Sequence, residues 1–357
     1  MFELGFGNYF QRKIASDRSN LSEEVNSVLV FRLVSYLIIL LSAALYFPKD
    51  FVNLTLVVTI ISTIFIFSTN WILIKIFYGL DGLGMYRSVF YRFLISRVFL
   101  IIGVMILIPL DVSLTFIMAT FLITAILEFS LLFYFLIRIK LIKFRIDLRI
   151  KVLRKIFLYS VPMGLSVFFV IVYDRVDVLL IQKIINTEAV SYYAIAYSLY
   201  KIPSIIIPIV LTPLFTDLSS EFEFSKKLNL FRLKNISLLL IGFAIISIII
   251  TYFFADAIIG LTYGEKYLSS TNLLILLTLA LPFLFLNNLT GTTLNAIKKE
   301  RYAFYSTTIV ATVNILLNII LLSTVGLIGA VITTIISEFL VFLLQFNYLM
   351  RLRMEFF

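Results

Sequence analysis

Long runs of apolar residues, separated by short polar or charged segments, set the pattern of this chain. The runs cover about residues 27–46, 51–78, 88–110, 112–137, 155–183, 188–214, 233–254, 268–290, 302–323 and 325–350. A helix needs about 20 consecutive apolar residues to cross the hydrocarbon core of a bilayer, and each run is long enough. Strands that cross a membrane alternate apolar and polar residues, which these runs do not. The pattern therefore predicts an all-α, polytopic membrane protein with about ten transmembrane helices.

Basic residues gather in alternate segments between the runs. One set of segments holds Arg12, Lys13, Arg18, Arg138, Lys140, Lys143, Arg145, Arg149, Lys151, Arg154, Lys155, Lys226, Lys227, Arg232, Lys234, Lys298, Lys299, Arg301, Arg351 and Arg353. The intervening segments hold only Lys49, Lys183 and Lys266. Because cytoplasmic loops carry the excess of Lys and Arg, both termini are predicted to be cytoplasmic. The interleaved apolar residues of segment 138–155 predict a helix lying on anionic lipid of the inner leaflet.

Composition excludes several classes of function. The chain is 61% hydrophobic and 14% charged, whereas soluble domains are about 45–50% apolar and about 25% charged. It has no His and no Cys, which excludes imidazole acid–base catalysis, thiol nucleophiles, disulfides and metal sites built from those ligands. No cofactor, metal or enzymatic activity is predicted. The net charge of +10 lies in the loops, so nucleic acid is not an expected partner.

Two pairs of runs indicate an internal repeat. Residues 80–87 (LDGLGMYR) and 294–301 (LNAIKKER) each precede two runs joined by a short turn. The second run of each pair contains one acid, Glu128 or Glu338. The repeat predicts two related bundles, residues 1–150 with four spans and residues 151–357 with six. Parallel repeats of this kind are typical of transporters that hold substrate between their halves.

Several motifs, in this order and spacing, resemble one family of membrane transporters. They are Pro162-Met163-Gly164-Leu165, Tyr173-Asp174-Arg175-Val176-Asp177, Thr187-Glu188-Ala189-Val190-Ser191-Tyr192-Tyr193, Tyr263-Gly264-Glu265-Lys266-Tyr267 and Gly326-Leu327-Ile328-Gly329-Ala330. The chain resembles the Wzx-like polysaccharide and O-antigen flippases of the multidrug/oligosaccharidyl-lipid/polysaccharide (MOP) exporter superfamily. Members of that family begin with two more helices, so the resemblance implies a first bundle with four helices instead of six.

The resemblance implies a transport function. Flippases of this kind move an undecaprenyl-diphosphate-linked oligosaccharide from the cytoplasmic to the external leaflet, by alternating access around a cationic cavity. The product would serve O-antigen, capsule or another surface glycan. The implied partners are the lipid-linked oligosaccharide, membrane lipid and a glycan polymerase complex, and the implied location is the inner membrane of a bacterium.

Three alternatives remain open. The related multidrug branch extrudes drugs or cations, and a cavity rich in carboxylates would favour that activity. A chain without the first two helices could be a non-transporting component of a glycan assembly complex. A glycan polymerase or membrane glycosyltransferase would need a catalytic site in a large external loop, and the external segments here are short.

Charged residues within the apolar runs are the first candidates for function, because each costs about 2.5–3.5 kcal/mol to insert. Asp174 and Asp177 are three positions apart and share a helix face, while Arg175 points about 100° away from Asp174. Arg175 is a candidate diphosphate contact, since a guanidinium binds phosphate oxygens in pairs. Asp174 and Asp177 are candidate ion-coupling carboxylates. The alternative role for all three is an interhelical salt bridge.

Other buried or aromatic positions complete the candidate site. Arg97 and Lys201 are candidate substrate contacts, whereas Arg32 and Arg92 are expected to reach the membrane interface through their long stems. Tyr193 could stack on sugar rings, but an interfacial belt is the favoured interpretation of the whole tyrosine cluster, which comprises Tyr192, Tyr193, Tyr197 and Tyr200. Glu128 and Glu338 are candidate coupling groups, although pairing with a base or a hydroxyl of a neighbouring helix is favoured.

Overall fold

The computed structural model describes residues 4–17, 19–46, 51–80, 85–110, 112–143, 145, 149–225 and 228–356, with side chains for all of these except 51–53, 85–90, 92 and 352–356. Within these ranges every regular element is a helix, so the predicted all-α fold is confirmed. Predictions that concern Arg18, Lys49, residues 81–84, the Arg92 side chain, Lys226 and Lys227 lie outside the described residues.

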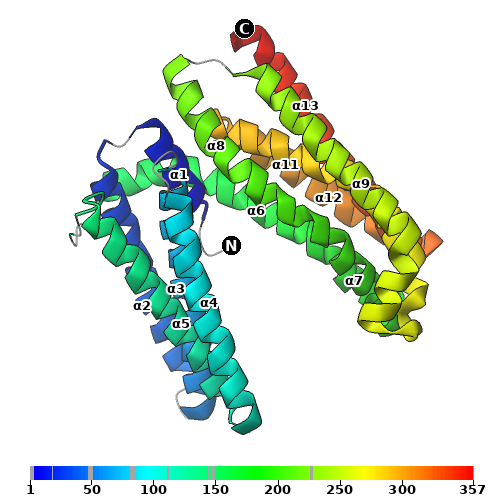
Figure 1. The fold of residues 1–357 in the computed structure, drawn as a ribbon, viewed down its shortest axis with the longest axis horizontal. Helices are drawn as coiled ribbons and strands as arrows, with labels where there is room; N and C mark the ends of the chain where they lie inside the picture. The colour runs from blue at the N-terminus through cyan, green and yellow to red at the C-terminus, as the bar shows by residue number, and fades with distance from the viewer. Residues whose placement is uncertain are drawn as a thin grey trace. The chain divides into compact units, whose positions relative to one another are not determined.

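The helices form two compact units, Met1–Gly164 and Leu165–Phe357, each with its own core. Figure 1 shows the helices of both units. The elements of unit 1 are α1 (Phe6–Ser16), α2 (Leu21–Tyr46), α3 (Phe51–Tyr78), α4 (Met85–Leu107), η1 (Ile108–Leu110), α5 (Leu114–Arg138) and the first part of α6 (Ile150–Ile184). Those of unit 2 are the rest of α6, α7 (Thr187–Lys201), η2 (Ile202–Ile205), α8 (Ile206–Ser225), α9 (Leu230–Tyr263), η3 (Glu265–Ser270), α10 (Thr271–Thr278), α11 (Leu281–Ala296), α12 (Glu300–Val325) and α13 (Leu327–Phe356). The units divide inside α6, whereas the sequence predicts bundles that meet at residues 150 and 151.

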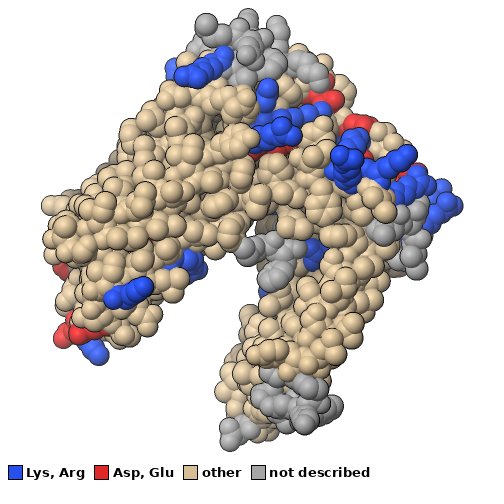
Figure 2. All heavy atoms as spheres, turned by 180° about the vertical axis from the view of Figure 1, so that it is seen from behind, with Lys and Arg blue, Asp and Glu red and all other residues tan. Residues whose placement is uncertain are grey.

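The predicted number of spans agrees with the structure. Nine helical segments among the described residues are long and apolar enough to cross a membrane. A tenth arises if Glu265–Thr278 and Leu281–Ala296, which meet at an angle of 47°, count as one broken span. Figure 2 shows wide uncharged surfaces along the helices on the face it presents. Many large apolar side chains lie on the outside, such as Leu261 at 88% exposure. Lipid, rather than water, is the solvent that such a surface fits.

The basic segment 138–155 differs from its predicted form. Helix α5 ends at Arg138 and α6 begins at Ile150, and the residues described between them are turn or irregular. Ile142 and Leu153 are buried in the core of unit 1. The expected single amphipathic helix over this segment is therefore wrong, because the residues described between α5 and α6 are not helical, and Ile142 and Leu153 pack into the core of unit 1.

The helix breaks after Lys201, which is a residue of the candidate functional site. Helix α7 ends at Lys201 and the short 3₁₀ helix η2 follows, with Pro203 inside it. Proline has no backbone N–H to donate and cannot continue a regular α-helix. The chain resumes as α8, and α7, η2 and α8 together form one span, Thr187–Ser225.

The α12–α13 hairpin allows a first prediction about stability. Gly326 adopts φ +68° at the turn, and a Cβ at Gly329 would lie 2.4 Å from the Leu321 carbonyl oxygen. We expect Gly329→Ala to destabilise the protein by about 2 kcal/mol, because the backbones of α12 and α13 must separate. Gly242→Ala is the matched control, since its Cβ would meet nothing within 4 Å. Thermal unfolding of the two purified variants in detergent makes the comparison, and equal midpoints would contradict the prediction.

Candidate functional site

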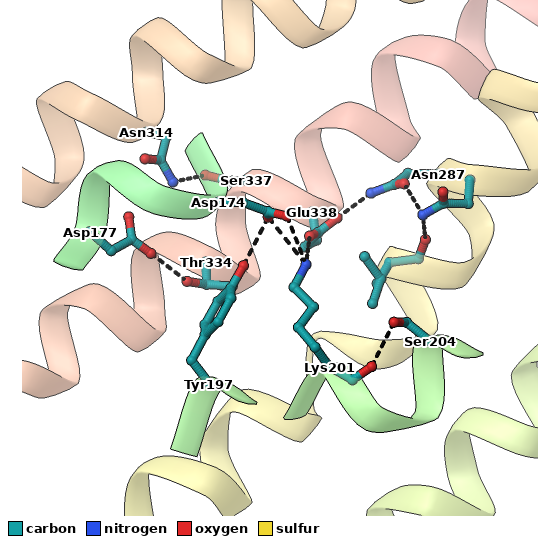
Figure 3. A network of polar contacts seen from close by, with 12 residues as sticks. Asp174, Asp177, Tyr197, Lys201, Ser204, Asn287, Asn314, Thr334, Ser337 and Glu338 are labelled. Atoms are coloured by element: carbon teal, nitrogen blue, oxygen red, sulfur yellow. Dashed lines mark hydrogen bonds and ion pairs between the residues drawn. The ribbon is translucent and has the colours of Figure 1, made fainter. Parts of the chain in front are cut away.

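A cluster of polar and charged side chains lies inside unit 2, and Figure 3 shows its central part. Helices with apolar sequences cannot expose such groups to lipid at low cost, so the groups turn toward one another. The cluster is made of Asp174 and Asp177 from α6, Tyr193, Tyr197, Tyr200 and Lys201 from α7, Asn287 from α11, Asn314 and Asn318 from α12, and Thr334, Ser337 and Glu338 from α13.

Lys201 is the centre of the first half of this cluster. Its Nζ atom lies 3.1 and 3.2 Å from the two carboxylate oxygens of Asp174 and 3.9 Å from Glu338 Oε1. The Tyr197 hydroxyl donates to Asp174 at 2.8 Å, and Asn287 Nδ2 donates to Glu338. Glu338 is fully buried. The ammonium group therefore balances two carboxylates that would otherwise be costly inside the helices.

Aromatic rings complete the surroundings of the Lys201 ammonium. Nζ lies 5.2 Å from the centroid of the Tyr197 ring and 5.4 Å from that of Tyr200. Carboxylates together with aromatic faces are the groups that recognise ammonium ions in proteins. Lys201 thus occupies, with its own side chain, a site suited to a small organic cation. The structure does not place it as an unpaired cation available for phosphate.

Asp177 is the centre of the second half. The Tyr193 hydroxyl donates to its carboxylate at 2.7 Å, and Asn318 Nδ2 donates to the other oxygen at 2.7 Å. The Thr334 hydroxyl lies 3.4 Å away. The Asp177 side chain is buried, and no cation contacts it within the described part of unit 2. Asp177 is thus a buried carboxyl group held only by neutral donors, which makes it a candidate for binding a proton or a cation.

Two further hydrogen bonds, one within α12 and one from α12 to α13, extend this half of the cluster. Asn318 Nδ2 also lies 3.1 Å from Asn314 Oδ1, and Asn314 Nδ2 donates to Ser337 at 2.9 Å. Asn287, Asn314, Asn318 and Thr334 are not among the residues predicted from the sequence. Asn314 and Asn318, four positions apart in an apolar run, were the available signal for a polar helix face.

The tyrosine cluster does not form an interfacial belt. Tyr193 and Tyr200 are fully buried and Tyr197 is 9% exposed. The hydroxyl groups of Tyr193 and Tyr197 donate to Asp177 and Asp174. The belt interpretation is wrong for these three residues, because all three are buried. Acids on α6 supply the polar partner of Tyr193 and Tyr197, whereas the Tyr200 hydroxyl has no hydrogen-bond partner among the described residues. Tyr193 is positioned to hold Asp177 and is not exposed for stacking on a sugar.

Arg175 lies apart from this cluster, although it is next to Asp174 in sequence. Its side chain is exposed, whereas Asp177 on the same helix is buried. No ion pair of Arg175 occurs among the residues that the structure describes. The predicted difference in direction between Arg175 and the two acids is therefore present.

Unit 1 contains a smaller charged group. Arg97 Nη2 of α4 lies 3.7 Å from Glu128 Oε2 of α5, and the Glu128 side chain is 2% exposed. The Arg97 guanidinium also lies 4.4 Å from the centroid of Phe93. Glu128 and Glu338, at matched positions of the repeat, both pair with a base, as the favoured interpretation predicts.

Arg32, also in unit 1, does not reach toward the interface as expected. It is 4% exposed, and its Nε and Nη2 atoms donate to Thr69 Oγ1 and the Phe65 carbonyl, both at 3.1 Å. Hydroxyl and carbonyl acceptors on α3 hold its guanidinium inside the unit. Among the described residues, no group of three or more His, Cys, Asp or Glu side chains could hold a metal ion.

Comparisons with known proteins give a family and a fold. The model of the polysaccharide biosynthesis protein family matches residues 1–219. An uncharacterized membrane protein of Methanocaldococcus jannaschii is 31% identical over 104 residues, which are 29% of this chain and 20% of that protein. The chain thus spans about a fifth of the length of this curated relative.

Several solved transporters share the fold. A point mutant of the Vibrio cholerae MATE transporter VcmN matches 99% of this chain and 84% of its own with a TM-score of 0.82 at 12% identity. An outward-facing multidrug resistance MATE family transporter of the MOP superfamily matches the same shares, with a TM-score of 0.78 at 14% identity. A MOP superfamily transporter from Pyrococcus furiosus matches 99% and 85%, with a TM-score of 0.76 at 15% identity.

Proposed function

The chain belongs to the polysaccharide biosynthesis protein family, and on that premise we propose that it is a flippase for a lipid-linked oligosaccharide. The family match is the observation that carries the proposal. The fold, which it shares with MOP superfamily transporters, supports transport over covalent catalysis. The substrate class is a glycan joined through a diphosphate to a polyprenyl chain, which the protein moves to the external leaflet for assembly of a surface polysaccharide such as O-antigen or capsule.

The pairing of charges supports a role for Arg175 in binding the diphosphate. Lys201 and Arg97 each contact a buried carboxylate, so their charges mainly neutralise acids within their own units. Arg175 is exposed within a long apolar helix, where an arginine without a partner is expensive. A phosphate group would supply two acceptors for its guanidinium.

The carboxylates fit a second role in the same cycle. Asp174, Asp177 and Glu338 gather in unit 2, and Glu128 lies in unit 1. We assign ion or proton coupling to Asp177 first, because neutral groups surround it. The other three acids already have a basic partner, so each would be free to bind a proton or a cation only when that partner moves away.

Replacing Arg175 tests the proposed function. We expect Arg175→Ala to lower the flipping rate by about tenfold or more, because one bidentate phosphate contact is lost, and to leave stability unchanged. Proteoliposomes with a fluorescent undecaprenyl-diphosphate oligosaccharide give the rate, read by a membrane-impermeant enzyme that modifies the outer glycan. Arg175→Lys should retain part of the activity, and Lys183→Ala is the control on the same helix. Full activity of Arg175→Ala would exclude this role, and absence of flipping by the wild type would overturn the function itself.

Extrusion of organic cations is the second candidate function. Unit 2 holds two acids that share one lysine and a third acid, Asp177, that is held by neutral donors. This excess of carboxylates favours extrusion of cations, because such a cluster attracts them. Efflux of ethidium from the same proteoliposomes distinguishes the two functions. Reporter fusions to both termini test the proposed cytoplasmic location, and co-purification with a glycan polymerase tests association with an assembly complex.

A further inference from the structure

A groove lies between three helices of unit 2, and none of the residues of the polar cluster lines it. Helices α9, α11 and α13 enclose a volume of about 670 Å³. Apolar side chains such as Phe231, Leu289, Phe342 and Phe346 form most of its wall. A volume of this size, in the range of about 300–1,000 Å³, is typical of sites for small molecules with much apolar surface.

The polar groups of the groove are already satisfied, with one exception. Thr290 donates to Gln345 Oε1 at 2.7 Å, Thr293 donates to the Leu289 carbonyl at 2.8 Å, and Ser237 donates to the Lys234 carbonyl at 2.7 Å. The remaining polar group is the Lys234 ammonium, which lines the groove near the beginning of α9. The groove is thus an apolar channel with one positive charge.

Two other basic residues of unit 2, unlike Lys234, form ion pairs with acids. Arg232 pairs with Asp217, and Lys298 pairs with Glu223. No carboxylate pairs with Lys234 in the described part of unit 2. A lysine at the start of a membrane-spanning helix lies near the headgroups, where its charge attracts anionic lipid. The charge and the apolar wall therefore complement one kind of ligand, an amphiphile with an anionic head.

We propose that this groove binds an anionic phospholipid, with an acyl chain between α9, α11 and α13 and the phosphate at Lys234. The acyl chain would make van der Waals contacts with the apolar wall of the groove. The anionic head distinguishes this lipid from a zwitterionic one, whose ammonium group cancels the attraction. One lysine near the surface should favour the anionic lipid by about fivefold. This binding is independent of the proposed flippase activity.

Lipid binding to the purified protein tests the proposal without any transport assay. We would titrate delipidated protein with phosphatidylglycerol or phosphatidylcholine of equal chain length and count bound lipids by native mass spectrometry. The wild type should bind phosphatidylglycerol about fivefold more tightly, and Lys234→Gln should lose this preference. Ser237→Trp, which fills the groove, should weaken both lipids. Lys266→Gln is the control, because Lys266 is a basic residue of η3 outside the groove.

The outcomes that overturn the proposal are equally specific. Equal binding of the two lipids by the wild type would remove the role of the charge. Unchanged preference in Lys234→Gln would place the anionic site elsewhere. If Ser237→Trp binds both lipids as tightly as the wild type, and its elution profile shows that it is folded, the acyl chain does not lie in the groove.

Discussion

Lys201→Met is expected to destabilise the protein by about 3 kcal/mol and to abolish transport, because removal of one partner leaves a buried charge uncompensated. The ammonium lies 3.1 Å from Asp174 and 3.9 Å from Glu338. Asp174 is 25% exposed and Glu338 is 1% exposed, so the expected cost is at the lower end of the range for buried pairs. Thermal unfolding in detergent and the flipping assay measure the two effects. Lys183→Met, an exposed lysine on α6, is the matched control.

A double-mutant cycle and a chemical rescue separate the lost charge from lost packing. Asp174→Asn combined with Lys201→Met should lower the free energy of unfolding by less than the sum of the two single variants. The reason is that each charge destabilises the protein mainly when its partner is missing. Ethylammonium should raise the unfolding midpoint of Lys201→Ala and leave the wild type unchanged, since carboxylates and tyrosine rings bind small ammonium ions. Additive single effects, together with no response to ethylammonium, would mean that Lys201 acts only through packing.

The fold followed from the sequence because the bilayer leaves few options. Apolar runs of sufficient length can only be helices, and a charge within such a run must find a partner or a polar space. These two rules predicted the number of spans and the burial of Glu128 and Glu338, while the pitch of an α-helix predicted the separate direction of Arg175. They apply along one helix at a time and need no knowledge of how the helices pack.

The partners could not be predicted by the same rules. Lys201 and Asp174 are 27 positions apart, and Asn318 is 141 positions from Asp177. Only the packing of α6, α7, α12 and α13 brings these groups together. The hydrophobic pattern is nearly uniform around each helix, so it does not indicate which face turns inward.

Tyrosine and arginine were the least predictable residue types. Both combine an apolar body with a polar end, and both fit either a membrane interface or a buried site with an acceptor. Tyr193 donates to Asp177, and Arg32 donates to groups on α3. In each case the acceptor is on another helix. The interfacial interpretation failed because the sequence does not show that acceptor.

Asp177→Asn is expected to keep the fold and to remove the dependence of transport on an imposed ion or proton gradient. The amide oxygen can still accept from Asn318 Nδ2, and the NH₂ group, in place of the oxygen that faces Tyr193 and Thr334, can donate to the hydroxyl oxygen of either residue. We expect a loss of stability below about 1.5 kcal/mol from this rearrangement. Transport should fall to the rate seen without a gradient, because an amide neither releases a proton nor supplies a negative charge to a cation. Flipping assays with Na⁺ or proton gradients of either direction measure this effect.

Two further variants show whether this effect belongs to the carboxylate itself. Asp177→Leu should destabilise the protein by about 3 kcal/mol, because the Tyr193 hydroxyl and the Asn318 amide both lose a buried acceptor. Tyr193→Phe keeps the carboxylate and removes one donor, so gradient dependence should remain while stability falls by about 1 kcal/mol. If Asp177→Asn still responds to the gradient, the coupling group must be one of the acids that has a basic partner. Glu338 would then be the first to replace, since it is the more buried of the two acids that contact Lys201.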